Sequence, residues 1–242
     1  MAVPAPSLVK GTFSELAQSI FKVKGEPLRY KDQSYLLPGL DDTSYGTVLY
    51  RTGRQVGKTT LLAIKQLVPC IVFPGYQTLY TSPSYKQTKE YSKARTEPLI
   101  KDSTYIQSHL IDRYCSQGIE TKSFTNGSRV LGRYAFYTAD RTRGISAAQI
   151  AVDEIQDLLI DNLPVIEQCL AHSKPPALHP EWAPFYKKRI YAGTPKTNQN
   201  SIEHFWEHST QCIWVVPCRV CGHWNQLHEK SIGKHGTICA RS

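Results

Sequence analysis

The sequence predicts an α/β fold with a mainly parallel central sheet flanked by helices. Residues 47–51 form a strand-like run that leads through a glycine-containing turn into a helix-compatible run, 59–68, and a second strand-like run, 77–81, follows. Two further short apolar runs, 148–152 and 189–192, each end in polar or glycine-containing segments. Strands that alternate with helices in this way are typical of βαβ units, whose strands lie parallel in one sheet.

Length and composition indicate a folded protein with a polyanionic partner. The chain has 242 residues, of which 40% are hydrophobic, and this suffices for one large domain and a small appendage. Its 29 Lys and Arg against 20 Asp and Glu give a net charge of +9. The charge favours nucleic acid as a partner, although a merely solvated basic surface would have the same composition.

The start of the chain and the distribution of its apolar residues argue against a membrane protein. Residues 1–18 lack the basic and apolar regions of a secretion signal, and no apolar run approaches the roughly 20 residues that cross a bilayer. We therefore expect an intracellular protein without membrane association, whose seven cysteines stay reduced.

Changes along the chain predict three parts. Residues 1–45 form an N-terminal segment with one amphipathic helix near 13–21, and residues 46–217 form the core. Residues 218–242 form a small separate module, because the chain becomes rich in Cys, His and Gly after Pro217.

Three runs within the core predict further elements. Asn126-Gly127 lies between two runs rich in β-branched and aromatic residues, which predicts a hairpin with a two-residue primed turn at a sheet edge. Residues 163–171 predict a helix. Residues 84–100 predict an exposed helix, whose basic face consists of Lys86, Lys89, Lys93 and Arg95.

Residues 52–60, TGRQVGKTT, predict a phosphate-binding loop. The loop follows a strand and precedes a helix, where backbone N–H groups and the helix dipole converge on an anion. Lys58 would contact the β- and γ-phosphates of ATP, and the Thr59 hydroxyl would bind Mg²⁺. The usual spacing is not met, because Thr52 stands where the first glycine should. The expected nucleotide contacts are Gly53, Arg54, Gln55, Val56, Gly57, Lys58, Thr59 and Thr60.

A second acidic motif completes the predicted site. The apolar residues 150–152 end in Asp153 and Glu154, so both carboxylates would emerge at the carboxyl end of a central strand, where nucleotides bind in such sheets. Asp153 would hold Mg²⁺ through its hydration shell, and Glu154 would polarise the attacking water as a general base. Together with the phosphate loop, this pair predicts an ATP-hydrolysing site.

These motifs resemble the ATPase domain of the large terminase subunit of tailed bacteriophages, the motor that moves DNA into a procapsid. Residues 53–59 are similar to the family's phosphate loop, in which Arg-Gln stands before Gly-Lys-Thr. Residues 139–145, followed by Asp153-Glu154, look like its Arg-Gly element and second acidic motif, and residues 192–195 look like its coupling motif.

The resemblance covers about residues 25–217 and implies a RecA-like P-loop ATPase core, ATP and Mg²⁺ as cofactors, and a homo-oligomeric ring that moves double-stranded DNA. It also implies a procapsid portal and the small terminase subunit as partners, and action in the host cytoplasm with transient association at the portal. Gln33 stands in a context similar to the family's adenine-contacting segment, although an exposed glutamine without a role is the alternative. Thr194, in the coupling motif, would contact the nucleotide.

Two arginines are candidates for stabilising the charge that develops on the transferred phosphoryl group. Arg54 lies in the phosphate loop and would act within its own subunit. Arg143 precedes the strand of the acidic motif, and a strand of about five residues spans roughly 16 Å, so Arg143 would lie at the far end of that strand. It would act on the neighbouring subunit of a ring, with Arg141 as a second choice. The alternative role for Arg143 is local pairing with Asp140.

The cysteines of the last segment have the spacing of half a zinc site. Cys218 and Cys221 are separated by two residues, and Cys239 would supply a third thiolate. His235 or a residue beyond 242 would be the fourth ligand, and free thiols are the alternative. Cys212 is expected to pack in the strand before this module. We expect core or half-buried positions for Cys70, Cys115 and Cys169.

Three functions are compatible with these patterns, and a DNA-packaging ATPase is the leading one. The second is a helicase-like or remodelling ATPase, because Asp-Glu-x-Gln at 153–156 also occurs in strand-separating motors. Such helicases need a second RecA-like lobe, for which the residues after 217 are too few. The third is a zinc-ribbon DNA-binding adaptor with a vestigial phosphate loop. The 242 residues contain no convincing nuclease site, so we expect no DNA cleavage by this chain alone.

Overall fold

The structure is a computed structural model that describes residues 12–31, 33–197, 200–226, 228, 231–233 and 236–241. The chain divides into two compact units, Met1–Phe205 and Trp206–Ser242. This division precedes the predicted boundary at residue 217, and the three predicted parts stay a prediction.

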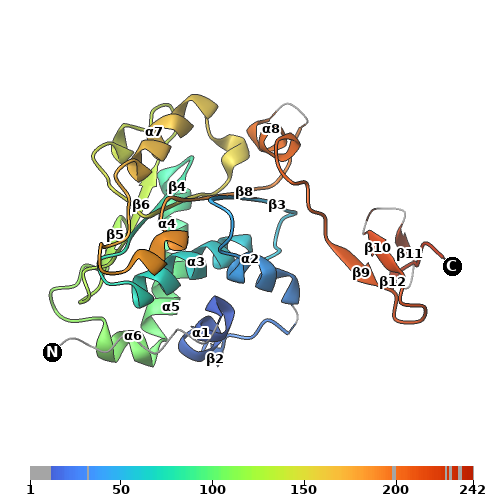
Figure 1. Cartoon of the computed structure of the whole chain (residues 1–242), viewed down its shortest axis with the longest axis horizontal. Helices are drawn as coiled ribbons and strands as arrows, with labels where there is room; N and C mark the ends of the chain where they lie inside the picture. The colour runs from blue at the N-terminus through green and yellow to red at the C-terminus, as the bar shows by residue number, and fades with distance from the viewer. Residues whose placement is uncertain are drawn as a thin grey trace. The chain divides into compact units, whose positions relative to one another are not determined.

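A six-stranded sheet forms the centre of the larger unit, in the order β3-β8-β7-β4-β6-β5 (Figure 1). All neighbours pair in parallel except the edge strand β5, which is antiparallel to β6. The predicted α/β fold with a mainly parallel sheet is therefore confirmed. The strands are β3 (Thr47–Arg51), β4 (Gln77–Ser82), β5 (Thr121–Ser123), β6 (Arg129–Tyr134), β7 (Gln149–Val152) and β8 (Lys188–Gly193).

Helices cover both faces of this sheet (Figure 1), as the apolar residues of β7 require. Successive side chains of a strand point to opposite faces. Accordingly, Ala151 packs in the cluster that contains α3 residues such as Leu62, whereas Ile150 and Val152 pack in the cluster that contains Ile166 of α7. Two separate apolar cores thus fix the orientation of β7 and of the acidic residues that follow it.

The first core is covered by α1 to α6 and the second mainly by α7. The helices are α1 (Phe13–Ile20), α2 (Leu37–Asp41), α3 (Lys58–Val72), α4 (Tyr85–Tyr91), α5 (Glu97–Lys101), α6 (Thr104–His109), α7 (Leu163–Glu167) and α8 (Ser201–Glu207). Short elements of the larger unit are the strands β1 (Lys22–Val23) and β2 (Glu26–Pro27) and the 3₁₀ turns η2 (Ser34–Leu36), η4 (Asp140–Thr142), η5 (Ile155–Asp157), η6 (Ile160–Asn162), η7 (Gln168–Leu170) and η8 (Pro180–Phe185).

The helix after the phosphate loop is longer than predicted. α3 continues past residue 68 and through Pro69 to Val72. Proline removes one backbone donor from a helix, but the residues on either side, Val68 and Cys70, are fully buried. Burial in the first core therefore outweighs the local preference for a helix end at the proline.

The predicted basic helix is a continuous helical run with one irregular turn. α4 and α5 are joined by a π-helical segment, η3 (Ser92–Thr96). Its four basic residues are exposed as predicted. Other residues of the run are buried, since Thr88, Tyr91 and Thr96 are each no more than 3% exposed. The run is therefore an integral layer of the fold, and a purely solvated helix was too simple an expectation.

The predicted hairpin exists, but its turn is of another type. β5 and β6 pair at the sheet edge as expected. The Phe124 N–H donates to the Ser128 carbonyl, and the Gly127 N–H donates to the Phe124 carbonyl. This pairing leaves three loop residues, of which Gly127 alone has a positive φ, +82°. A turn followed by a left-handed glycine replaces the predicted two-residue primed turn, because the strands pair one step further out.

The described residues of the smaller unit form two antiparallel strand pairs, β9 (Val215–Pro217) with β10 (Trp224–Gln226) and β11 (Ile232–Gly233) with β12 (Gly236–Thr237). Cys212 is exposed and precedes β9, so its predicted packing within a strand is wrong. Cys70 and Cys169 are buried and Cys115 is half-buried, as predicted.

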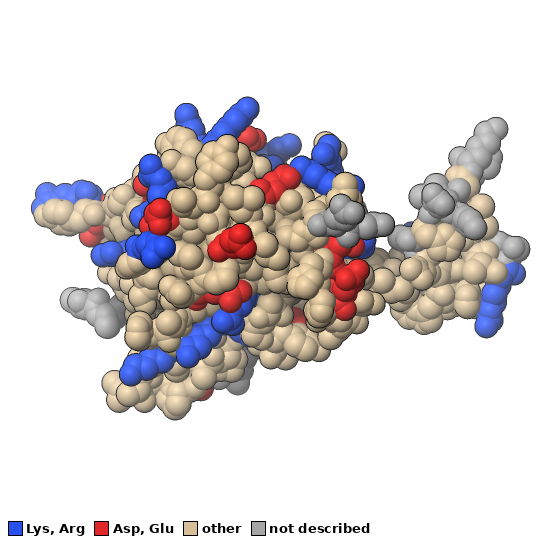
Figure 2. Space-filling model, turned by 90° about the horizontal axis from the view of Figure 1, so that it is seen from above, with Lys and Arg blue, Asp and Glu red and all other residues tan. Residues whose placement is uncertain are grey.

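No helix among the described residues is long and apolar enough to cross a membrane. On the face seen in Figure 2, Lys and Arg side chains are scattered among Asp and Glu and do not form one continuous patch. The net charge of +9 is therefore not concentrated on this face.

Candidate functional site

The phosphate-loop residues connect the end of β3 to the start of α3. Gly57 has a φ of +83° and precedes Lys58, the first residue of α3. A Cβ atom on Gly57 would lie 3.3 Å from Leu36 and 3.4 Å from the Gln33 amide oxygen, so both the φ and the close approach favour glycine. Gln33 therefore lies beside the loop with an exposed side chain, and its contact to the nucleotide stays a prediction.

Lys58 is connected to two other predicted residues. Its Nζ donates to Thr194 Oγ1 at 2.9 Å and lies 3.5 Å from Glu154 Oε1. Thr194 directly follows β8, which pairs with β3 so that Arg51 lies opposite Gly193. Parallel pairing thus brings together, at the carboxyl edge of the sheet, residues 136 positions apart. The lysine side chain is only 9% exposed, so its charge is held next to these partners.

Asp153 and Thr59 form the second half of the site. Thr59 Oγ1 donates to Asp153 Oδ2 at 3.3 Å, and the Tyr80 hydroxyl donates to the same oxygen at 3.1 Å. Burial, and next the charge of Glu154, raise the pKa of Asp153 to about 6. A hydroxyl and a carboxylate are the oxygen ligands that Mg²⁺ prefers, directly or through its waters. The residues present therefore fit a magnesium ion, whose charge would favour the ionised form of Asp153.

Glu154 adopts a backbone conformation that is uncommon for a non-glycine residue. Its φ of +52° and ψ of +43° are left-handed, at a cost of roughly 1–2 kcal/mol. Gln156 Nε2 donates to its carboxylate, and Gln156 Oε1 accepts from the Thr194 N–H at 3.1 Å. A Cβ on Gly193 would lie 2.3 Å from that amide oxygen, so a larger residue there would displace the Gln156 side chain from this position. Strain supported by neighbours in this way is typical of functional sites.

Two residues of this network were not predicted as site residues. Tyr80 contacts Asp153 from the neighbouring strand β4, and Gln156 links Glu154 to the residue after β8. A tyrosine in an apolar strand gives no local signal of this contact. For Gln156 the available signal is its place in the Asp-Glu-x-Gln pattern at 153–156, which puts it close to Glu154.

Arg54 and Arg143 are exposed, and no hydrogen bond or ion pair joins either of them to the described residues of this network. Arg54 is exposed within the phosphate loop, and no ion pair joins it to another described residue. Arg143 pairs with Asp140 at 2.8 Å, the local pairing considered from the sequence. No hydrogen bond or ion pair joins Arg143 to Lys58 or Glu154, all of which the structure describes.

The residues just before Arg143 lie near the carboxyl ends of β4 and β6, whereas the sequence predicts that Arg143 lies at the far end of β7. The Arg141 guanidinium lies 4.6 Å from the ring centroid of Tyr134, the last residue of β6. Tyr134 pairs with Ser82 at the carboxyl end of β4. The turn η4, which precedes Arg143, therefore lies near the carboxyl ends of these strands, and the predicted place of Arg143 stays a prediction.

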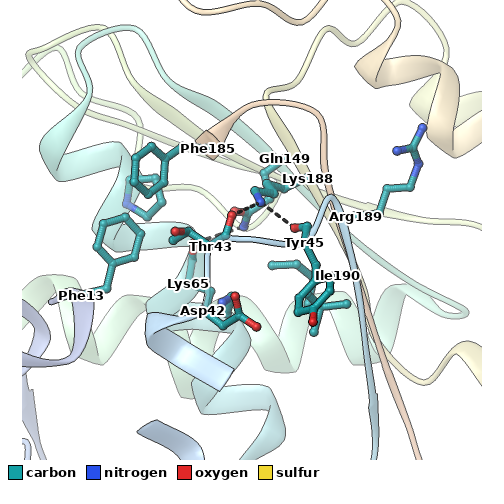
Figure 3. Close-up of a pocket in the computed structure, with 12 residues that line it drawn as sticks. Phe13, Asp42, Thr43, Tyr45, Lys65, Gln149, Phe185, Lys188, Arg189 and Ile190 are labelled. Carbon is teal, nitrogen blue, oxygen red and sulfur yellow. Dashed lines mark hydrogen bonds between the residues drawn. The ribbon is translucent and has the colours of Figure 1, made fainter. Parts of the chain in front are cut away.

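A small pocket at the opposite edge of the sheet has a structural role (Figure 3). It measures about 30 Å³, which is room for about one water molecule. Lys188 Nζ donates to the carbonyls of Thr43 and Tyr45, and Lys65 Nζ donates to those of Gly39 and Leu40. Burial lowers the pKa of Lys65 to about 8. Both ammonium groups are satisfied by the backbone before β3, so they hold this segment in place.

The predicted cysteine cluster is present in the smaller unit. The sulfur atoms of Cys218, Cys221 and Cys239 all lie within 4.8 Å of one another, and those of Cys221 and Cys239 are 3.6 Å apart. Tetrahedral zinc with Zn–S bonds of about 2.3 Å places its sulfur ligands roughly 3.8 Å apart. Backbone N–H groups of Cys221 and Val220 lower the pKa of Cys218 to about 7. The three thiols therefore fit a zinc ion, and the suggested fourth ligand, His235, lies outside the described residues.

Comparisons with known proteins agree on one family. Residues 37–236 match the family described as phage terminase large subunit gpA, ATPase domain. Among solved structures, the chain is similar to the large terminase of bacteriophage HK97, at 12% identity and a TM-score of 0.64 over 83% of this chain and 41% of that one. It therefore spans about two fifths of the length of that protein.

The chain is also similar to the large terminase ATPase domain of Thermus phage P74-26, at 16% identity and a TM-score of 0.54 over 84% of this chain and 78% of that one. At these identities the likeness shows the fold alone. A search of the curated proteins gave no match.

Proposed function

Because the chain belongs to the family of phage terminase large subunit ATPase domains, we propose that it hydrolyses ATP to drive double-stranded viral DNA into a procapsid. The observation that carries the proposal is the group of side chains at the carboxyl edge of the sheet. Lys58, Thr59, Asp153, Glu154 and Thr194 come from three separate segments, and hydrogen bonds or an ion pair connect them.

Each of these residues has a distinct task in the proposed reaction. Lys58 binds the β- and γ-phosphates in place of its present partners, and the phosphate-loop N–H groups surround them. Thr59 and Asp153 hold Mg²⁺, which supplies neutralisation of the phosphate charge. Glu154 accepts a proton from the attacking water. Thr194, hydrogen-bonded to Lys58 and to Gln156, connects the phosphate site to β8.

The two alternative functions predict other outcomes. A helicase-like ATPase would separate DNA strands, and an adaptor with a vestigial phosphate loop would bind DNA without ATP turnover. The left-handed Glu154 supports turnover, because a vestigial loop gives no reason to retain a strained residue beside Lys58.

The test is the rate of ATP hydrolysis with and without double-stranded DNA and portal-bearing procapsids. Only packaging requires ATP, double-stranded DNA and procapsids together. We therefore expect both DNA and procapsids to stimulate hydrolysis, and we expect DNA to become protected inside procapsids. DNA binding without any ATP turnover would instead support the adaptor, and strand separation without protection would support the helicase.

We further propose that Cys218, Cys221 and Cys239 bind a structural zinc ion. Metal analysis of purified protein should give about one zinc per chain, since three thiolates with one further ligand complete a tetrahedral site. Cys239→Ser should reduce this content at least several-fold. The matched control is Cys212→Ser, an exposed cysteine outside the cluster, which should leave it unchanged. Equal zinc in both variants, or none in the wild type, would end the zinc assignment.

A further inference from the structure

The helical run after β4 brings an arginine into the candidate ATP site. A pocket beside the acidic motif is lined on one side by Thr59, Asp153 and Glu154. On the other side it is lined by Gln87, Glu90 and Arg95, from α4 and η3. The sequence suggested only that this run carries an exposed basic face. Of its four basic residues, Arg95 is the one that lines the pocket.

Two stacked tyrosines hold this run against the acidic motif. The rings of Tyr80 and Tyr91 lie 3.6 Å apart and are parallel to within 3°. The Tyr80 hydroxyl donates to Asp153, and the Tyr91 hydroxyl donates to Gln66 of α3. Arg95 follows Tyr91 by about one helical turn, and both residues line the same pocket. Buried aromatic packing thus holds the helical run that carries Arg95 next to Asp153.

The turn that carries Arg95 is itself irregular. η3 is π-helical, and the Thr96 hydroxyl donates to the carbonyls of Tyr91 and Ser92. Single π-helical turns within α-helices occur frequently at functional sites, because they change which side chains face a neighbouring element. Here the turn directs Arg95 to the pocket while Thr96 stays buried.

The charge of Arg95 is available to a ligand. Its side chain donates to the Ala94 carbonyl at 3.2 Å, and no ion pair joins it to a described carboxylate. By contrast, Lys93, in the same segment, pairs with Glu97 at 2.8 Å. Three carboxyl groups face the pocket, so an anion would enter as a complex with Mg²⁺. A guanidinium has the planar set of donors that binds a phosphate group through two hydrogen bonds.

We propose that Arg95 binds the γ-phosphate of Mg²⁺-bound ATP within its own subunit. This inference rests on the proposed function, because it requires that the triphosphate occupies the loop at Lys58 and that its terminal phosphate reaches the pocket beside Thr59 and Glu154. Arg95 then distinguishes ATP from ADP, and it links the state of the nucleotide to the helical run over β4.

The experiment compares the affinities of a non-hydrolysable ATP analogue and of ADP, both with Mg²⁺, by titration of fluorescent nucleotides. Arg95→Ala should weaken binding of the analogue about 10–100-fold, because hydrogen bonds between charged groups are lost, and should change ADP affinity less than about twofold. Arg95→Lys should have an intermediate effect, since it keeps the charge and loses the planar donors. The matched control, Lys93→Ala, should change neither affinity.

The outcomes separate this inference from the proposed function. If the wild type binds both nucleotides and Arg95→Ala weakens both equally or neither, Arg95 does not bind the γ-phosphate. If the wild type binds neither nucleotide, the proposed function fails as well. A melting curve of each variant shows whether it is folded. If Arg95→Ala does not fold, the ratio of the affinity for the ATP analogue to that for ADP in Arg95→Lys and Arg95→Gln tests in the same way whether Arg95 binds the γ-phosphate.

Discussion

Glu154→Gln is expected to abolish ATP hydrolysis while ATP affinity stays within a few-fold of the wild type. Glutamine keeps the shape of the side chain and its hydrogen bond with Gln156, but it cannot accept the proton of the attacking water. Loss of general-base catalysis alone costs typically 10²–10⁴ in rate. Steady-state phosphate release measures the first effect, and nucleotide titration measures the second.

The comparison with Lys58→Ala separates a loss of nucleotide binding from a loss of catalysis. Lys58 would contact the phosphates in the ground state, so its loss should reduce both hydrolysis and nucleotide affinity. It also leaves the Glu154 carboxylate without its partner at 3.5 Å. An equal loss of ATP binding in the two variants would refute the separate roles, because it would show that both residues act on binding.

Arg143→Ala should be inactive alone yet recover activity when mixed with Glu154→Gln. An arginine that acts on a neighbouring subunit contributes about 10³–10⁵ to the rate in related phosphoryl-transfer enzymes. Arg143 is exposed, and its pairing with Asp140 is a surface ion pair of the kind that contributes about 0–1 kcal/mol, so it can be released to a neighbour. In a mixed ring, some interfaces combine an intact Glu154 site with an intact Arg143.

The matched control for this experiment is a mixture of Lys58→Ala with Glu154→Gln. Every site in that ring lacks one of its own residues, so no rescue is expected. If the Arg143 mixture also stays inactive while rings form, Arg143 does not act in trans, and Arg54 becomes the remaining candidate from the sequence.

Local patterns were sufficient to predict the core of the candidate site. The phosphate loop and the acidic pair each follow an apolar strand, and parallel strands present their carboxyl ends at one edge. Chain geometry alone therefore brought Thr59 to within 3.3 Å of Asp153, 94 residues away. The same reasoning predicted the order of strand, loop and helix, because each step depended on residues close in sequence.

Contacts between distant segments could not be predicted in this way. The stacking of Tyr80 on Tyr91, and the resulting place of Arg95, depend on how α4 packs over β4. A basic helix face that lines a site and one that is merely solvated have the same sequence pattern. They differ only in what packs against them, which the sequence alone does not show. The prediction of the hairpin's turn type was wrong for a related reason. The pairing of Phe124 with Ser128 is set by the register of β5 against β6, and not by Asn126-Gly127 alone.

The most direct test of the proposed site is a crystal structure with a non-hydrolysable ATP analogue and Mn²⁺ in place of Mg²⁺. The anomalous signal of Mn²⁺ locates the metal independently of the protein. We predict a peak about 2.1 Å from Thr59 Oγ1 and within one bridging water of Asp153, with the triphosphate enclosed by residues 52–59. A metal peak away from Thr59 and Asp153, or a nucleotide bound elsewhere on the chain, would contradict the site.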